Sequence, residues 1–232
     1  MAQDDIPGPA DAPGAAPPAG GGAAERPGLN AIGLRRGTDK SSRHHDFLRL
    51  YESFFAPLRD RALRILEIGV WEGQSLQTWA EFFPRALVVG ADINPDTVRF
   101  AGGRIAVEVV DQSDAARLAA LAAAHGPFDI VVDDGSHVWT HQILTLQVLL
   151  PHVVAGGFYV VEDIDTSYGE SGEHYNGGAK VSPAQYLHAM ADYLVGDRYT
   201  DLDAEPDAFK RAHARRLDFV AFARRTAVLK VR

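Results

Sequence analysis

Two apolar runs that end in acidic residues decide the fold of this chain. Residues 128–137 read Phe-Asp-Ile-Val-Val-Asp-Asp-Gly-Ser-His, and residues 157–165 read Gly-Phe-Tyr-Val-Val-Glu-Asp-Ile-Asp. Short apolar runs of this kind are typical of strands that are buried on both faces. Because ligands bind outside the carboxyl ends of the strands in an open parallel sheet, we expect both acidic ends to face a ligand.

The two acidic ends come together if the runs form neighbouring strands. Asp134, Glu162 and Asp163 then supply three carboxylates at one point, which suits a hard divalent cation such as Mg²⁺. His137 lies beside them in the sequence as a candidate general base. Each acidic pair alone is consistent with an ordinary strand end or cap, whereas both pairs together favour a functional site.

The rest of the chain alternates strand and helix patterns around these runs. Strands are expected at residues 63–68, 86–92, 105–110, 128–132 and 157–161, and helices at residues 43–55, 73–83, 114–125 and 140–154. Residues 217–222 and 226–231 read as two further strands joined by a tight turn. The pattern predicts an α/β fold: a seven-stranded, mostly parallel sheet covered on both faces, with a C-terminal antiparallel hairpin.

The composition is that of a globular protein with a sizeable core. Of 232 residues, 46% are hydrophobic and 23% charged, and none is cysteine. The lack of cysteine excludes disulfides, thiolate catalysis and zinc–cysteine sites. A net charge of −8 argues against nucleic acid or an anionic membrane as a partner. No apolar run approaches the ~20 residues that span a bilayer.

The N-terminal segment differs in composition from everything that follows it. Residues 1–28 are rich in proline, glycine and alanine, so we expect a disordered tail before one domain at residues 29–232. Acidic residues stand where a signal peptide begins with positive charge, and we therefore expect a cytoplasmic protein.

The end of the first strand has the features of a cofactor turn. Residues 67–75 read Glu-Ile-Gly-Val-Trp-Glu-Gly-Gln-Ser, and Gly69 and Gly73 bracket the turn into the next helix. The spacing is not the dinucleotide G-x-G-x-x-G, which disfavours a nicotinamide or flavin enzyme. Asp92 ends the second strand, where an acidic residue accepts ribose hydroxyls. Residues 111–112, Asp-Gln, end the third strand and are placed to read an adenine edge.

With these motifs the chain resembles class I S-adenosylmethionine-dependent methyltransferases with a Rossmann-like fold. More narrowly, it is similar to the magnesium-dependent sugar O-methyltransferases of macrolide and aromatic polyketide biosynthesis, a family with cephalosporin hydroxylase-like relatives. The segments that carry the resemblance are residues 37–40 (Gly-Thr-Asp-Lys), 65–70, 90–93, 111–112, 133–137 and 161–164. The resemblance covers residues 37–168 well and is weak before and beyond them.

The resemblance implies a role for each matching residue. The metal ligands would be Asp134, Glu162 and Asp163, with His137 as general base. The cofactor-binding residues would be Thr38, Lys40, Glu67, Gly69, Ser75, Asp92, Asp111, Gln112 and Asp133. The implied cofactors are S-adenosylmethionine and Mg²⁺, and the implied acceptor is a hydroxyl of a deoxysugar on a polyketide or macrolide. Asp133 has the alternative of supporting the turn, and assembly into a homo-oligomer is left open.

Several other residues are weaker candidates. His141 is the second choice for the base, and Asp165 is a candidate for the outer shell of the metal. Residues 166–180 form a long glycine-rich segment that we interpret as an acceptor-recognition lid, with disorder as the alternative. Trp71 is expected to line the cofactor pocket and Trp139 to contact the acceptor, whereas helical spacing places Trp79 in the core.

Two other functions remain open at this point. A catechol or phenol O-methyltransferase would use the same metal to chelate vicinal phenolic oxygens. A non-catalytic nucleoside-binding protein would keep the cofactor turn, but it would not need the intact set of carboxylates and base.

Overall fold

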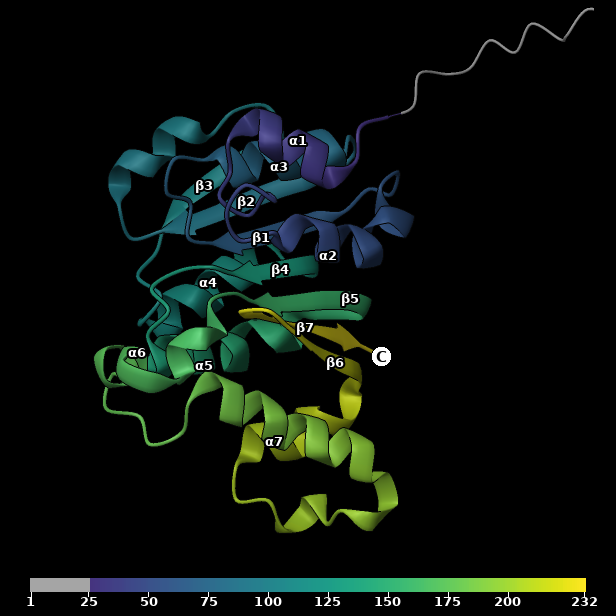
Figure 1. Ribbon diagram of the computed structural model, residues 1–232, viewed down its shortest axis with the longest axis vertical. Helices are drawn as coiled ribbons and strands as arrows, with labels where there is room; N and C mark the ends of the chain where they lie inside the picture. Colours follow the sequence, from purple (N-terminus) through teal and green to yellow (C-terminus); the bar gives the residue numbers. More distant parts are fainter. Residues whose placement is uncertain (1–25) are drawn as a thin grey trace, which may run out of the picture.

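The computed structural model describes residues 26–232, so the predicted tail lies outside the described residues except for residues 26–28. The described chain forms one seven-stranded sheet with the order β3-β2-β1-β4-β5-β7-β6 (Figure 1). The strands are β1 (Arg64–Ile68), β2 (Leu87–Asp92), β3 (Ile105–Val109), β4 (Phe128–Asp133), β5 (Val153–Val161), β6 (Leu217–Ala223) and β7 (Thr226–Val231). Strands β1 to β5 run parallel, and β7 lies antiparallel between β5 and β6.

Helices cover both faces of the sheet, which confirms the predicted α/β class. The α-helices are α1 (Leu29–Arg36), α2 (Phe47–Phe55), α3 (Gln74–Phe82), α4 (Ala115–His125), α5 (Trp139–Leu149), α6 (Gly169–Tyr175), α7 (Pro183–Gly196) and α8 (Ala208–His213). Short 3-10 turns are η1 (Ala56–Leu58), η2 (Pro95–Phe100), η3 (Leu150–His152), η4 (Ile164–Ser167), η5 (Asp197–Tyr199), η6 (Leu202–Ala204) and η7 (Ala214–Arg216).

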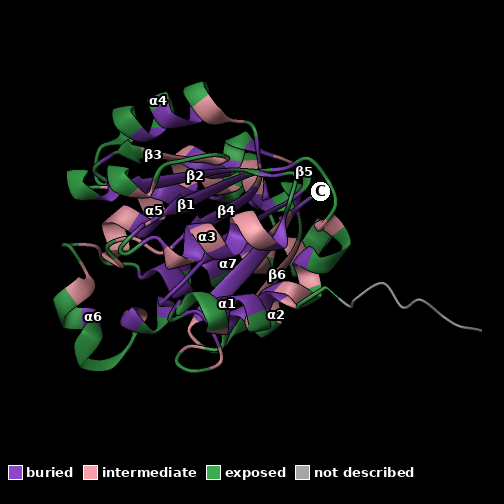
Figure 2. Ribbon diagram, turned by 90° about the horizontal axis from the view of Figure 1, so that it is seen from above, coloured by how far each residue is buried: buried purple, intermediate pink, exposed green. Residues whose placement is uncertain are grey.

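The sheet separates two hydrophobic cores. Residues of α1, α2 and α3 pack on one face, and residues of α4, α5 and α7 pack on the other. On β4, Ile130 and Val132 join the first core and Val131 joins the second, because successive side chains of a strand point to opposite faces. Figure 2 shows the buried residues gathered on the strands and on the helix sides that face them.

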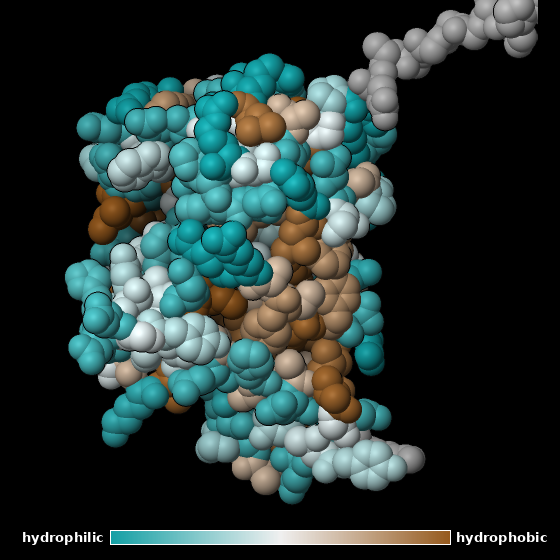
Figure 3. All heavy atoms as spheres, in the orientation of Figure 1, coloured by the Kyte–Doolittle hydropathy of each residue, from teal (hydrophilic) through white to brown (hydrophobic). Residues whose placement is uncertain are grey.

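The sheet edge beside α2 carries an aromatic cluster. Phe54 of α2 packs with Phe158 and Phe219 at ring-centroid distances of 6.0 and 5.5 Å. In Figure 3 an apolar area of surface lies over the region where Figure 1 places α2 and the C-terminal strands. The first core therefore extends along the sheet to the antiparallel hairpin.

The predicted helix at residues 140–154 is wrong at its end. Helix α5 stops at Leu149, a 3-10 turn containing Pro151 follows, and β5 already begins at Val153. Proline lacks the N–H that continues a helix and clashes with the preceding turn, so the chain leaves the helix there. The other predicted strands are found within two residues of their expected ends, and Asp114 caps α4 by accepting from the amides of Ala116 and Arg117.

Two further expectations are settled by burial and local structure. Trp79 is 1% exposed, which confirms it as a core residue. The segment at residues 166–180 includes part of η4 and all of α6, so it is partly helical rather than one long loop. No helix within residues 26–232 is long and apolar enough to cross a membrane.

Candidate active site

A cavity of about 370 Å³ lies at the carboxyl ends of the central strands, where the order of the sheet reverses between β1 and β4. This is the position at which open α/β sheets bind ligands. The predicted cofactor residues that line the cavity are Thr38, Lys40, Gly69, Ser75, Asp92, Asp111 and Gln112. Trp71, Asp134 and His141 also line it, so the cavity reaches from the glycine turn to the first acidic cluster.

The glycine turn is built so closely that it excludes a side chain. Gly69 has a φ of +91°, and a Cβ placed on it would lie 2.0 Å from the carbonyl oxygen of Asp134. The amides of Val70 and Trp71 donate to Oδ2 of Asp92 at 2.8 and 3.2 Å. Asp92 therefore holds the turn with Oδ2, and its Oδ1 accepts from the amide of Asn94 at 2.8 Å, while the residue lines the cavity.

Gln112 connects the end of β3 to the first acidic cluster. Its Nε2 donates to Oδ1 of Asp133 at 2.7 Å, and its Oε1 accepts from the amide of Ser136 at 2.9 Å. The neighbouring Asp111 accepts from the amide and hydroxyl of Ser113 through the same oxygen, Oδ1. Both ends of the Gln112 amide thus have partners within the protein, and the reading of an adenine edge by residues 111–112 stays a prediction.

Asp133 lies behind the wall of the cavity. It is fully buried and does not line the cavity, which fits the alternative role of supporting the turn, and its role toward the cofactor stays a prediction. Burial raises the pKa of Asp133 to about 8, against the opposing effect of the hydrogen bond from Gln112. Asp133 follows Val131 on the same side of the strand, and this direction takes its side chain into the sheet–helix interior.

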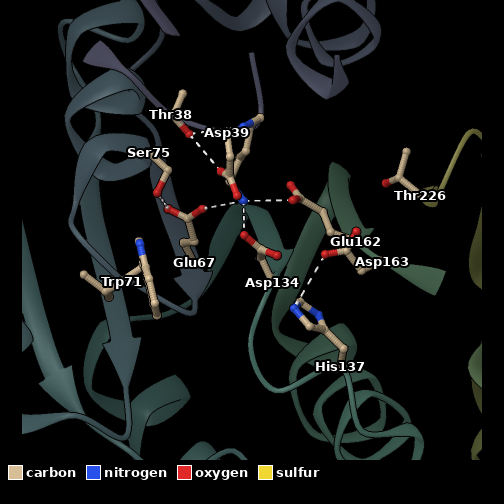
Figure 4. Close-up of polar contacts among 12 residues, drawn as sticks. Thr38, Asp39, Glu67, Trp71, Ser75, Asp134, His137, Glu162, Asp163 and Thr226 are labelled. Atoms are coloured by element: carbon tan, nitrogen blue, oxygen red, sulfur yellow. Dashed lines mark hydrogen bonds and ion pairs between the residues drawn. The ribbon is translucent and has the colours of Figure 1, made fainter. Parts of the chain in front are cut away.

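Lys40 forms ion pairs with three carboxylates, those of Glu67, Asp134 and Glu162. Figure 4 shows these three carboxylates directed toward one point. Nζ of Lys40 donates to Asp134 and, at 2.8 Å, to Oε2 of Glu162, and it lies 3.3 Å from Oε1 of Glu67. Its side chain is 1% exposed. Burial alone would lower the pKa of Lys40, but the three carboxylates raise it well above its usual value. Although Lys40 borders the cavity, its charge is directed at protein carboxylates rather than at a cofactor.

Glu67 holds the cofactor turn from inside the protein. Its Oε2 accepts from the Ser75 hydroxyl at 2.7 Å and from Nε1 of Trp79 at 3.1 Å. It is fully buried and does not line the cavity, and its predicted contact with the cofactor stays a prediction. Burial raises the pKa of Glu67 to about 7, although the charge of Lys40 acts in the opposite direction.

Glu162 is held by residues from both ends of the chain. The hydroxyl of Tyr51 donates to Oε1 of Glu162 at 3.0 Å and lies 3.0 Å from Oγ1 of Thr226. Thr226 in turn donates to the carbonyl of Val161 at 3.0 Å. Burial, followed by repulsion from Asp134, raises the pKa of Glu162 well above its usual value.

Asp134, His137 and Asp163 form the more accessible part of the site. One ligand atom from each lies within 4.8 Å of the others, and Nε2 of His137 is 3.5 Å from Oδ2 of Asp163. The side chains of Asp134 and His137 are 22% and 24% exposed. His137 and Asp163 have positive φ values of +58° and +53°, and such strained backbone is concentrated at functional sites.

The structure brings the predicted metal ligands together only in part. Asp134 and Asp163 share the accessible cluster with His137, whereas the Glu162 carboxylate is directed at Lys40 and Tyr51. Nδ1 of His137 is buried and has no hydrogen-bond partner among residues 26–232. The assignment of ligand and base within this group stays a prediction.

Two lower-ranked candidates have other contacts. His141 lines the cavity, and its Nδ1 lies 2.8 Å from the Ser136 hydroxyl. Trp139 donates from Nε1 to the carbonyl of Thr166 at 3.0 Å, which joins the start of α5 to η4. Trp71 lines the cavity as expected and is 81% exposed.

Sequence reasoning missed three residues that support the acidic clusters: Tyr51, Arg225 and Thr226. Arg225 lies in the turn between β6 and β7, and its guanidinium is 2.6 Å from Oδ1 of Asp163. These contacts depend on β7 pairing beside β5, with Val161 opposite Ala227. No local sequence motif indicates these contacts, because the three residues lie far from the acidic clusters in the sequence.

The fold is that of class I methyltransferases, and residues 66–164 match the family model described as a methyltransferase domain. The narrower resemblance to sugar O-methyltransferases of polyketide and macrolide pathways is also confirmed. The chain is 46% identical over 149 residues to 8-demethyl-8-alpha-L-rhamnosyl tetracenomycin-C 2'-O-methyltransferase of Streptomyces olivaceus, which covers 61% of this chain and 39% of that protein. It is 38% identical over 178 residues to demethylmacrocin O-methyltransferase of Streptomyces fradiae, covering 73% of this chain and 45% of that protein.

A solved structure matches most of this chain. MycE methyltransferase from the mycinamycin biosynthetic pathway, in complex with Mg, SAH and mycinamycin VI, superposes with a TM-score of 0.76 at 31% identity. The match covers 89% of this chain and 55% of MycE. This chain thus spans less than half the length of the two curated relatives and about half the length of MycE.

Proposed function

We propose that this protein transfers a methyl group from S-adenosylmethionine to a sugar hydroxyl of a glycosylated polyketide or macrolide, with the help of a divalent metal ion. The observation that carries the proposal is the continuity of the cavity, which runs from the glycine turn at Gly69 to Asp134. Asp134 belongs at the same time to the cluster with His137 and Asp163. A cofactor and an acceptor held at these two ends would meet beside the carboxylates and the imidazole.

The cofactor end suits a nucleoside joined to an amino acid. Asp92 and Asp111 line the cavity at the ends of β2 and β3, where a carboxylate accepts ribose hydroxyls or an adenine amine. Thr38 and Ser75 line it near the glycine turn. MycE was solved with SAH and has the same fold, which supports S-adenosylmethionine as the cofactor of this chain.

The charges of the site suit a divalent cation. The carboxyl groups of Glu67, Asp134, Glu162 and Asp163 outnumber the two cations beside them, Lys40 and Arg225. A bound cation would favour the ionised forms of Glu67 and Glu162, whose pKa values burial raises. Carboxylate oxygens are the ligands that Mg²⁺ prefers. Asp134 and Asp163 would hold the ion, and Glu162 would complete the predicted set. When bound, such an ion chelates neighbouring hydroxyls and lowers the pKa of one of them.

His137 would act as the general base. Its ring is partly exposed beside Asp134 and Asp163, with Nε2 at 3.5 Å from Oδ2 of Asp163. The imidazole takes the proton of the acceptor hydroxyl, and the oxygen then attacks the sulfonium methyl in line. The carbon–sulfur bond breaks as the carbon–oxygen bond forms, and S-adenosylhomocysteine leaves.

The same geometry gives His137 a second candidate role as a metal ligand, because it belongs to the 4.8 Å cluster. Mn²⁺ titration of His137→Gln and Glu162→Gln separates the roles. A base at His137 and a ligand at Glu162 predict weaker Mn²⁺ binding in Glu162→Gln only. Loss of Mn²⁺ binding in His137→Gln only would assign the ligand set to Asp134, His137 and Asp163.

The activity is tested with radiolabelled S-adenosylmethionine and a panel of acceptors. We expect label transfer to glycosylated macrolides or aromatic polyketides with free sugar hydroxyls, and loss of transfer when EDTA removes the metal. The matching aglycones should remain unlabelled. Transfer to catechol and not to glycosides would identify a phenol methyltransferase instead, and SAH binding without any transfer would favour a nucleoside-binding protein.

A further inference from the structure

The turn between β6 and β7 reaches into the second acidic cluster. Arg225 has a φ of +63°, and its guanidinium lies 2.6 Å from Oδ1 of Asp163 and 3.1 Å from Oδ2 of Asp165. Its backbone carbonyl accepts from the amide of Ile164 at 3.0 Å. One residue of the hairpin therefore contacts three consecutive residues of the turn that follows β5.

The neighbouring residue of the hairpin behaves differently. Arg224 is exposed, and its side chain makes no hydrogen bond or ion pair with the part of the chain that the structure describes. The side chain of Arg225 is 32% exposed, and that of Asp163 is 10% exposed. Of these two adjacent arginines, only Arg225 is directed at the carboxylates, so Arg224 is a matched control for it.

The contacts of Asp163 suggest what Arg225 does. Oδ1 of Asp163 faces Arg225, and Oδ2 faces Nε2 of His137 at 3.5 Å. The contact with Arg225 is an ion pair that holds Oδ1 on the side of the hairpin, so that the second oxygen is directed toward His137 and Asp134. A guanidinium can engage two carboxylates at once through its planar fork, whereas a lysine ammonium acts as a point charge.

We infer that Arg225 is a positioning residue, which orients the Asp163 carboxylate for metal binding from the C-terminal hairpin. This role rests on the proposed metal site. Residues that hold a metal ligand in place from behind commonly change metal affinity 10–100-fold when they are replaced. The hairpin then does more than form the edge of the sheet, because its turn places Arg225 beside the second acidic cluster.

The test is a titration of Mn²⁺ alone, followed by electron paramagnetic resonance, in wild type, Arg225→Gln, Arg225→Lys and the matched control Arg224→Gln. We expect Arg225→Gln to weaken Mn²⁺ binding by about 10–100-fold. Arg225→Lys should recover part of the loss, and Arg224→Gln should bind as wild type does. SAH affinity, measured by calorimetry in the same proteins, should stay unchanged because Arg225 does not line the cavity.

Each contrary outcome has a distinct meaning. Equal or tighter Mn²⁺ binding by Arg225→Gln would overturn the positioning role, and tighter binding would show that the guanidinium competes with the metal. Equal loss in Arg224→Gln would show a general effect of charge and would also overturn it. If Arg225→Gln does not fold, Arg225→Lys decides the question by the same criterion. Failure of wild type to bind Mn²⁺ would instead overturn the metal site, and this role with it.

Discussion

The two ends of the cavity are built in different ways. At the cofactor end, Gly69, Asp92 and Asp111 each lie at or just beyond the end of their own strand. At the acidic end, Glu162 depends on Lys40 and Tyr51, which precede β1, and on the C-terminal hairpin. The cofactor end is therefore assembled from local strand–turn–helix units, whereas the acidic end needs the whole sheet in place.

This difference predicts separable effects of substitution. Changes at the acidic end should alter metal binding, turnover or stability while they leave SAH affinity intact. Changes in the glycine turn should alter SAH affinity. A substitution at Gly69 should affect both the cofactor end and the acidic end of the cavity, because the Gly69 backbone lies against Asp134.

The largest expected effect comes from His137. His137→Gln removes the proposed base, and general-base catalysis contributes about 10²–10⁴-fold. We therefore expect kcat to fall by that factor, with SAH affinity unchanged by calorimetry. The comparison is His141→Gln, which should lose less. A greater loss in His141→Gln would transfer the role of base to His141.

A large loss of stability is expected from Lys40→Met. Removing one partner of a buried ion pair destabilises a protein by about 3–5 kcal/mol, because charged groups are left without a counter-ion. Urea unfolding should show this loss, and saturating Mg²⁺ should restore part of it. Lys180→Met is the matched control, since Lys180 is exposed. Unchanged stability in Lys40→Met would contradict a structural role for the buried ammonium.

Gly69→Ala should affect both ends of the cavity. A residue other than glycine at a positive φ costs about 1–3 kcal/mol, and here the Cβ also meets a backbone oxygen. Gly156→Ala is the control, because Gly156 has a φ of +78° with nothing within 4 Å of an added Cβ. We expect weaker SAH binding in Gly69→Ala only. Equal unfolding free energies and SAH affinities in both variants would contradict the close approach to Asp134.

The smallest expected effect comes from Tyr51→Phe. It removes one hydrogen bond to Glu162 and the contact with Thr226, and a hydrogen bond of this kind contributes about 1–3 kcal/mol. Thermal unfolding should shift down, while SAH affinity stays the same. A fall in SAH affinity without a fall in stability would show that the two ends are not separate.

The same contrast explains how much could be predicted from the sequence. The strands, the glycine turn and the acidic strand ends follow from local apolar runs and from the residues that end them. The burial of Glu67 and Asp133 could not be predicted from their position at a strand end alone. Strand alternation directs Glu67 toward α3 and Asp133 into the opposite interior, so neither reaches the cavity.

Long-range partners were beyond the reach of local patterns. Arg225 and Thr226 reach the acidic cluster only because β7 pairs with β5. Tyr51 reaches Glu162 only because α2 packs on that face of the sheet. The end of α5 at Leu149 was missed for a different reason. Its apolar pattern continues past Pro151 into β5, where the period changes from helix to strand.

The central claim is that one chain holds a cofactor site and a separate metal site that meet at Asp134. The most direct measurement is calorimetric titration of SAH and of Mg²⁺, each alone, into wild type and Asp134→Asn. We expect wild type to bind both, and Asp134→Asn to bind SAH with little change while it loses Mg²⁺ binding. Failure of well-folded wild type to bind SAH, or retention of Mg²⁺ binding by Asp134→Asn, would contradict the claim.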